Sequence, residues 1–222
     1  MNKRMISVGL MCLVLLSIIT VRDQFLDGEI VQSDNAFLNN SFTEQEITEE
    51  TNKKLRCSFI ENQGQIANEE VLIYGNLPNG KIAFGQNKVM FWMEGTNDII
   101  TLSFVGAQKV SPIGLDELVT KNNYFLGNRG TYTDVRNFGA IIYIDLWKGV
   151  DLYYQNTPSG AKYEFRVAPY ANPEDISVSC KGQEQLVIGK DSLKFLVSDG
   201  LFVDDGLKVL QEHKEIDAKF VA

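Results

Sequence analysis

The sequence predicts an all-β fold: an antiparallel, β-sandwich-like domain of short strands, preceded by an N-terminal hydrophobic export or anchor helix and an acidic linker. Short apolar stretches alternate with turn residues from residue 57 onward, as in all-β domains. No segment after Arg56 has the period of a long amphipathic helix. An uncharged apolar run opens the chain, and an acidic stretch separates it from the rest. The length of 222 residues suits one domain or a domain with a tail.

The first 21 residues have the features of an export segment. Lys3 and Arg4 precede an uncharged, largely apolar run of 17 residues, Met5 to Val21. This run is long for the core of a signal peptide and short for a membrane span. Basic residues before such a run keep the N-terminus inside and send the rest of the chain outside. We therefore expect residues 1–21 to be a signal peptide or a membrane anchor, and the protein to be secreted or on the cell surface.

Residues 22–56 are polar and acidic, with no sustained period, and we interpret them as a flexible linker. Thr43 to Glu46 resembles the start of a short helix. Asn39-Asn40-Ser41 is a sequon, so Asn39 is a candidate glycosylation site in this linker.

Residues 57–222 form the predicted all-β extracytoplasmic domain, and its first half has the pattern of a meander. Short polar connections join its strands, and such connections link antiparallel neighbours. The predicted strands are Val71–Tyr74, Lys81–Phe84, Val89–Met93 and Ile99–Val105.

The second half of the domain repeats this pattern. Tyr163, Phe165 and Val167 alternate with charged residues, which is typical of a half-buried strand. Pro169 and Pro173 exclude regular strand between them. We interpret Asp204-Asp205-Gly206 as a plain turn. The predicted strands are Ala140–Ile144, Val150–Tyr154, Lys162–Val167, Ile176–Cys180, Leu186–Ile188, Leu193–Val197 and Leu201–Val203.

Charge and motifs exclude several classes of function. A net charge of −8 disfavours nucleic acid as a partner and leaves the N-terminal segment as the only contact with a membrane. Gly75 to Lys81 has the spacing of a phosphate loop, but Ile82 follows where Ser or Thr is needed, and a hairpin turn explains it. The single histidine, His213, lies near no nucleophile motif. We expect a non-enzyme without cofactor or metal, whose partner is a protein or a cell-surface glycan.

Two features keep alternatives open. Cys57 and Cys180 form a disulfide in an oxidising compartment or remain two thiols, because no spacing ties them together. Asp145 and Asp151 lie near Trp147, Tyr153 and Tyr154, a set that suits a sugar-binding or glycan-cleaving surface. The same residues are also ordinary strand aromatics and turn-capping carboxylates.

Several stretches together resemble a known domain of unknown function. The segment Tyr143 to Tyr154 is similar to the family signature Y-x-D-x-Y/W-x-G-I-D-L-x-Y. The other matching stretches are Phe59–Gln65, Leu102–Ala107, Asn123–Asn128, Tyr163–Phe165 and Val167–Pro169. This domain occurs in large secreted bacterial and archaeal surface proteins, N-terminal to seven-bladed β-propeller-type (SBBP) repeats.

The resemblance implies an all-β, extracytoplasmic module and brings no catalytic residues. Its glycines, such as Gly149, stand where backbones turn, and Asp145 and Asp151 flank a tight connection where carboxylates accept backbone N–H bonds. Relatives tend to continue beyond the point that matches Ala222, so we expect a C-terminally shortened domain or a part of a longer chain. The expected role is adhesion, assembly or protein interaction; carbohydrate binding or cleavage is the alternative.

Overall fold

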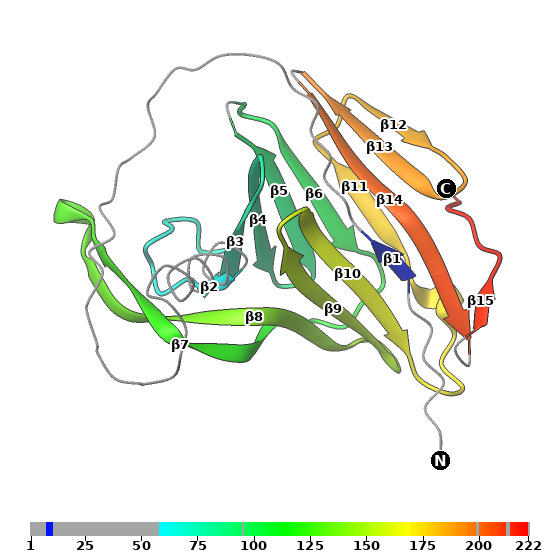
Figure 1. The fold of residues 1–222 in the computed structure, drawn as a ribbon, viewed down its shortest axis with the longest axis horizontal. Coiled ribbons are helices and arrows are strands. Elements are labelled where there is room, and N and C mark those ends of the chain that lie inside the picture. Colours follow the sequence, from blue (N-terminus) through cyan, green and yellow to red (C-terminus); the bar gives the residue numbers. More distant parts are fainter. Residues whose placement is uncertain (1–7, 11–57, 95, 199, 212–213, 222) are drawn as a thin grey trace, which may run out of the picture.

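In the computed structural model the domain consists of two curled antiparallel β-sheets (Figure 1). The structure describes residues 8–10, 58–94, 96–198, 200–211 and 214–221. Apart from two short 3-10 helices, η1 (Gly127–Arg129) and η2 (Pro173–Asp175), the regular elements described there are strands. The predicted all-β class is therefore confirmed.

The larger sheet has ten strands in the order β10-β9-β8-β2-β3-β4-β5-β6-β11, with β7 paired to β8. Strands β3 to β6 form the predicted meander, each pairing with the next along the chain. The bounds are β2 Phe59–Glu61, β3 Ile73–Leu77, β4 Gly80–Gly85, β5 Lys88–Met93, β6 Ile99–Phe104, β7 Ile113–Phe125, β8 Thr131–Trp147, β9 Val150–Thr157, β10 Gly160–Val167 and β11 Val178–Lys181.

Strand β8 joins the two halves of this sheet. β7 pairs along one edge of β8, while β9 and β2 share the other edge, β9 from residue 140 onward and β2 at residues 137–138. The hairpin β9–β10 consequently folds over the meander, and their side chains meet. The rings of Phe84 and Tyr154 pack edge to face, 5.0 Å between centroids, and Asn156 Nδ2 donates to the carbonyl of Asn76 at 2.8 Å. The long β7–β8 hairpin extends beyond this body (Figure 1).

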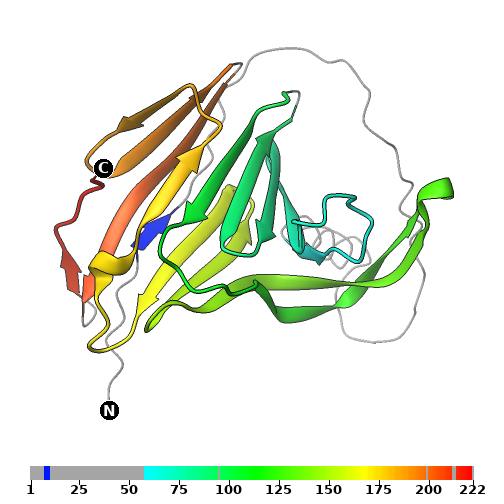
Figure 2. The same ribbon diagram turned by 180° about the vertical axis from the view of Figure 1, so that it is seen from behind.

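The smaller sheet stands beside β10 and β11 (Figures 1 and 2). It has five strands in the order β1-β14-β13-β12, with β15 also paired to β14. Phe195, Val197 and Phe202 of this sheet are buried in the same apolar core as the meander and the β9–β10 hairpin. The bounds are β1 Val8–Leu10, β12 Gln185–Ile188, β13 Ser192–Val197, β14 Gly200–Gln211 and β15 Lys214–Ile216.

Of the predicted export segment, the structure describes Val8–Leu10, which form β1 against β14. The other residues of that segment, the predicted linker 22–56 with Asn39, and Cys57 lie outside the described residues. In the part of the chain that is described, no helix is long and apolar enough to cross a membrane.

Several elements differ from the sequence prediction. Strand β7 and the first half of β8 were not expected, because polar residues interrupt the apolar ones there and the sequence shows no apolar alternation. The predicted turn at Asp204 to Gly206 is wrong: these residues lie in the middle of the 12-residue strand β14. Backbone pairing with β13 and β1 extends the strand through a sequence that resembles a turn.

Candidate functional site

A cavity of about 500 Å³ lies between the two sheets. Strands β6, β9, β10 and β11 line it from the larger sheet, and β12 to β15 line it from the smaller one. Apolar side chains predominate, which makes the cavity suited to an apolar group. The lining includes Leu102, Phe104, Tyr154, Tyr163, Phe165, Cys180, Leu186, Phe195, Leu207, Val209, Ile216 and Phe220.

Asp204 of β14 is the carboxylic acid among these lining residues. Its side chain is 5% exposed. Oδ2 accepts a hydrogen bond of 2.8 Å from the hydroxyl of Tyr163, whereas Oδ1 has no hydrogen-bond partner among the described residues. Burial disfavours the ionised form and raises the pKa of Asp204 to about 7.

A bulge in β14 follows Asp204 and decides which side chains beyond it face the cavity. Phe202 and Asp204 are buried on the inner face of the strand, two residues apart. Gly206 then adopts φ +74°, a conformation that glycine reaches without steric cost. The register with β1 shifts at the same place, and beyond it Leu207 and Val209 line the cavity. The bulge thus keeps apolar side chains on the inner face on both sides of Asp204.

The neighbouring polar groups of the cavity are held in their neutral forms. Burial raises the pKa of the Tyr163 hydroxyl well above its ordinary value, and the nearby Asp204 carboxylate adds to this effect. Burial likewise raises the pKa of the Cys180 thiol to about 11. At neutral pH Tyr163 is therefore a hydrogen-bond donor, and Cys180 carries little of the thiolate that nucleophilic chemistry requires. This arrangement suits binding of an apolar group better than covalent catalysis.

Cys180 lies on β11 and is half-buried. Its thiol donates to Oε1 of Gln183 at 3.2 Å. Because Cys57 lies outside the described residues, the disulfide between Cys57 and Cys180 stays a prediction.

The residues of the family-like segment Tyr143 to Tyr154 stabilise the turn from β8 to β9. Asp145 adopts φ +54° and accepts the backbone N–H of Gly149 at 2.6 Å, and its own N–H donates to Asp151 Oδ1 at 2.7 Å. Gln108 Nε2 donates to the carboxylate of Asp145 at 2.9 Å. The bond from Gly149, followed by that from Gln108, lowers the pKa of Asp145. The expected capping role of both carboxylates is confirmed.

The aromatic residues of the predicted sugar-binding set do not share one surface. Trp147 is 3% exposed, packs against Phe104 and donates its ring N–H to the carbonyl of Val105 at 2.9 Å. Tyr154 is buried. Tyr153 is half-buried, and the guanidinium of Arg166 lies 4.1 Å from its ring centroid. Trp147 borders a surface hollow with Gly106, Gln108, Asp145, Lys148 and Asp175, but most of its ring lies in the core.

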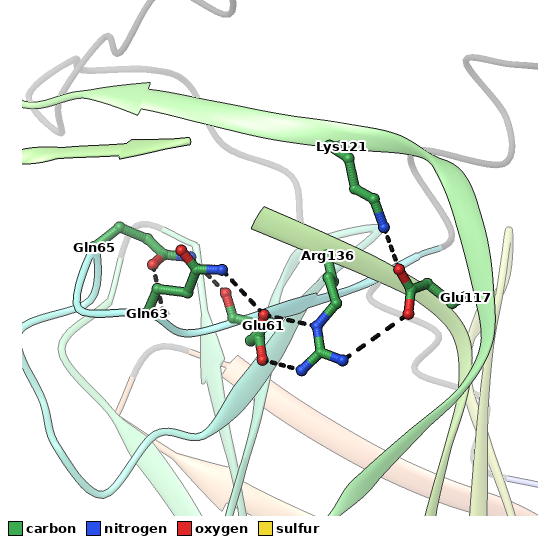
Figure 3. A network of polar contacts seen from close by, with 6 residues as sticks. All are labelled: Glu61, Gln63, Gln65, Glu117, Lys121 and Arg136. Carbon is green, nitrogen blue, oxygen red and sulfur yellow. Dashed lines mark hydrogen bonds and ion pairs between the residues drawn. The ribbon is translucent and has the colours of Figure 1, made fainter. Parts of the chain in front are cut away.

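A network of charged side chains ties β2 to the β7–β8 hairpin (Figure 3). Arg136 of β8 donates to both carboxylate oxygens of Glu61 and lies 3.9 Å from Glu117, which also pairs with Lys121 (Figure 3). The hydrogen bond from Arg136 lowers the pKa of Glu61. These side chains are partly exposed, and each is paired within the network, so we assign them a structural role.

The comparisons with known proteins give a family and no individual relative. Neither the curated proteins nor the solved structures contain a match to this chain. One family model, described as a domain of unknown function (DUF7948), matches residues 59–222, which is nearly the whole described domain. The chain therefore belongs to the DUF7948 family of domains of unknown function.

Proposed function

We propose that this chain is a non-enzymatic, extracytoplasmic module that binds other polypeptides at a cell surface, in adhesion or assembly. The observation that carries the proposal is the position of β1. This strand pairs with β14, yet it lies outside the matched domain of residues 59–222. The domain therefore accepts a strand that it does not itself supply, which is how modules that bind by strand addition take up partners.

The location outside the cytoplasm is supported by the N-terminal sequence. Lys3 and Arg4 before the run from Met5 to Val21 are the features of an export segment. We further propose, from the resemblance of its motifs, that the module precedes β-propeller-type SBBP repeats in a larger surface protein.

A fusion to alkaline phosphatase after Ala222 tests the location, because this reporter is active only outside the cytoplasm. We expect activity in the wild-type fusion. The matched control carries Leu15→Arg and Leu16→Arg, each of which costs about 3 kcal/mol at the centre of an apolar segment, and we expect it to be inactive. An inactive wild-type fusion, present in the cell in normal amount, would refute the location.

Carbohydrate binding is the alternative, and the position of Trp147 gives the means to separate the two. A buried indole cannot stack on a sugar, so Trp147→Phe is expected to lower stability without changing glycan binding. A glycan array that shows binding by the wild type, lost in Tyr153→Ala and kept in Trp147→Phe, would favour the alternative. No glycan bound by any variant would favour the interaction module.

A further inference from the structure

We infer that the space between β14 and β10 is an acceptor site for a β-strand, and that an extended, uncharged apolar strand of another polypeptide occupies it after export. Before export the chain's own β1 is seated there. The inference rests on the proposed function, since it requires the N-terminal segment to leave the domain.

The first observation is that one edge of β14 receives no strand from the matched domain. β13 pairs with residues 200–205 of β14, and β15 pairs with residues 209–211. β1 pairs with Asp205 and Val209, positions that β13 and β15 already occupy from the other side. β1 therefore takes the opposite edge, and without it the backbone groups of this edge have no ladder partner among the described residues.

The second observation is that β10 offers another edge beside the first. Among the described strands, β10 pairs with β9 alone. β1 also contacts β10, and it lies between β10 and β14 (Figure 1). A strand in this position is flanked on both sides by β-strands, one from each sheet. In natural proteins an exposed strand edge is usually covered by another element or carries charged residues. Without such protection the edge tends to pair with strands of other chains.

The third observation is that the apolar cavity lies next to the acceptor site. Leu207 and Val209 of β14 and Tyr163 and Phe165 of β10 all line it. Because successive side chains of a strand point to opposite faces, a strand seated between β14 and β10 turns every second side chain toward this cavity. Those side chains must be apolar to match the lining, and the neighbouring Asp204 with its bare Oδ1 disfavours a further acid.

The fourth observation is the position of β1 in the sequence. Val8–Leu10 lie within the apolar run from Met5 to Val21. Export either removes this run or places it in the bilayer, and in both cases it can no longer pair with β14. The exported domain would then keep an unpaired edge of β14 next to an apolar cavity. An apolar strand of another polypeptide would stabilise this domain, because it adds backbone hydrogen bonds to the edge and buries its own side chains in the cavity.

The first experiment asks whether β1 is seated in the full chain. Val8 and Val209 are opposite each other in the ladder, where Cα atoms lie about 4.5–5.5 Å apart, within the range of a disulfide. In a background with Cys12, Cys57 and Cys180 changed to serine, we expect Val8→Cys with Val209→Cys to form a disulfide under mild oxidation. The control pair, Val8→Cys with Leu201→Cys, should not, because Leu201 lies near the other end of β14 from Val209, the partner of Val8.

The second experiment asks whether the acceptor site binds a strand of another molecule. The probe is a labelled synthetic peptide with the sequence of residues 5–13, Cys12 replaced by serine. Because the chain's own β1 competes with the peptide, the chain used for uptake also carries Leu10→Pro, which removes a ladder hydrogen bond from that β1. We expect this chain, reduced, to take up the peptide and the oxidised Val8→Cys, Val209→Cys chain to exclude it. A peptide with Leu10→Pro should bind about tenfold more weakly, since proline removes a ladder hydrogen bond. If this pair prevents folding, Leu10→Cys with Asp205→Cys replaces it.

The outcomes separate the inference from the proposed function. Uptake that is equal in reduced and oxidised chains, or absent from both, overturns the acceptor site. Failure of the Val8–Val209 disulfide in a folded chain does so as well. An inactive phosphatase fusion refutes the extracytoplasmic role. This holds even if the disulfide forms and the peptide is taken up, which would still show that the acceptor site binds strands.

Discussion

Among the buried residues of the described core, Asp204 is the one whose side chain is least suited to its apolar surroundings. It is an acid that lines an apolar cavity, with one oxygen hydrogen-bonded to Tyr163 and the other without a hydrogen-bond partner in the described part of the chain. Ionising it there costs free energy, which is why its pKa is raised. A group of this kind links folding stability to pH.

Asp204→Asn is expected to remove a pH dependence of stability. The pKa of Asp204 in the folded chain, about 7, lies above the ordinary value of 3.8, so the folded state binds the proton more tightly. Its stabilising contribution is full below pH 4 and is lost as the pH rises toward 7, by up to about 4 kcal/mol. Urea unfolding at pH 5 and pH 8 measures the loss, which should persist largely in Asp205→Asn. Equal pH slopes in wild type and Asp204→Asn would contradict this account.

Asp145→Ala is expected to destabilise the turn from β8 to β9 by about 1–2 kcal/mol. The change removes the bonds from Gly149 and Gln108 to the carboxylate. Asp134→Ala is the matched control, because Asp134 has nearly the same backbone conformation, φ +57°, and its carboxylate accepts no such bonds from the described residues. Thermal unfolding of both variants separates the carboxylate bonds from the cost of alanine at positive φ. Equal losses in the two variants would show that the bonds contribute nothing.

At the scale of elements, β8 is the strand on which the arrangement of the larger sheet depends. It pairs with β7, β2 and β9, so its position decides where the meander and the β9–β10 hairpin lie. Part of its support is electrostatic, through the pairing of Arg136 with Glu61 on β2 and Glu117 on β7.

Arg136→Lys is expected to lower stability by less than about 1 kcal/mol, because lysine cannot donate to both oxygens of Glu61. The loss should shrink at high salt, since these side chains are partly exposed. Unfolding at low and high ionic strength measures it. Arg129→Lys, at a residue of η1 whose side chain forms no ion pair within the described residues, serves as the control. A loss that grows with salt would argue against the electrostatic role.

At the scale of the whole molecule, the cavity exists because two sheets and a C-terminal segment close around it. The segment after β15 is held by a backbone bond from Phe220 to Lys190 and by an ion pair between Lys190 and Asp217. Phe220 itself lines the cavity. Closure therefore depends on the connection between β12 and β13 and on the segment after β15.

Phe220→Ala is expected to open the cavity and to cost about 1 kcal/mol, as its ring is only partly buried. The fluorescence of 8-anilino-1-naphthalenesulfonate, which reports accessible apolar surface, should rise in the folded variant. Lys214→Ala, at an exposed residue of β15, should leave the dye signal unchanged. A signal that rises equally in both variants would show that the dye does not report on the cavity.

The sequence predicted the class, the meander and the role of Asp145 and Asp151 because each rests on local chemistry. Alternation of apolar residues marks strands, and polar turns fix their order. It missed β7 because a strand stabilised by backbone pairing with β8 needs no apolar alternation. It placed Trp147 on a ligand surface because periodicity says which side chains share a face, but not what covers that face.

The sequence alone determined that this chain forms antiparallel strands from residue 57 onward and begins with an apolar run typical of export. Only the tertiary structure decided that Asp204 is buried beside Tyr163, and that β1 lies between β14 and β10 next to an apolar cavity. The physical reason is that strand formation depends on neighbours along the chain, whereas burial and open edges depend on which strands meet, and those lie far apart in sequence.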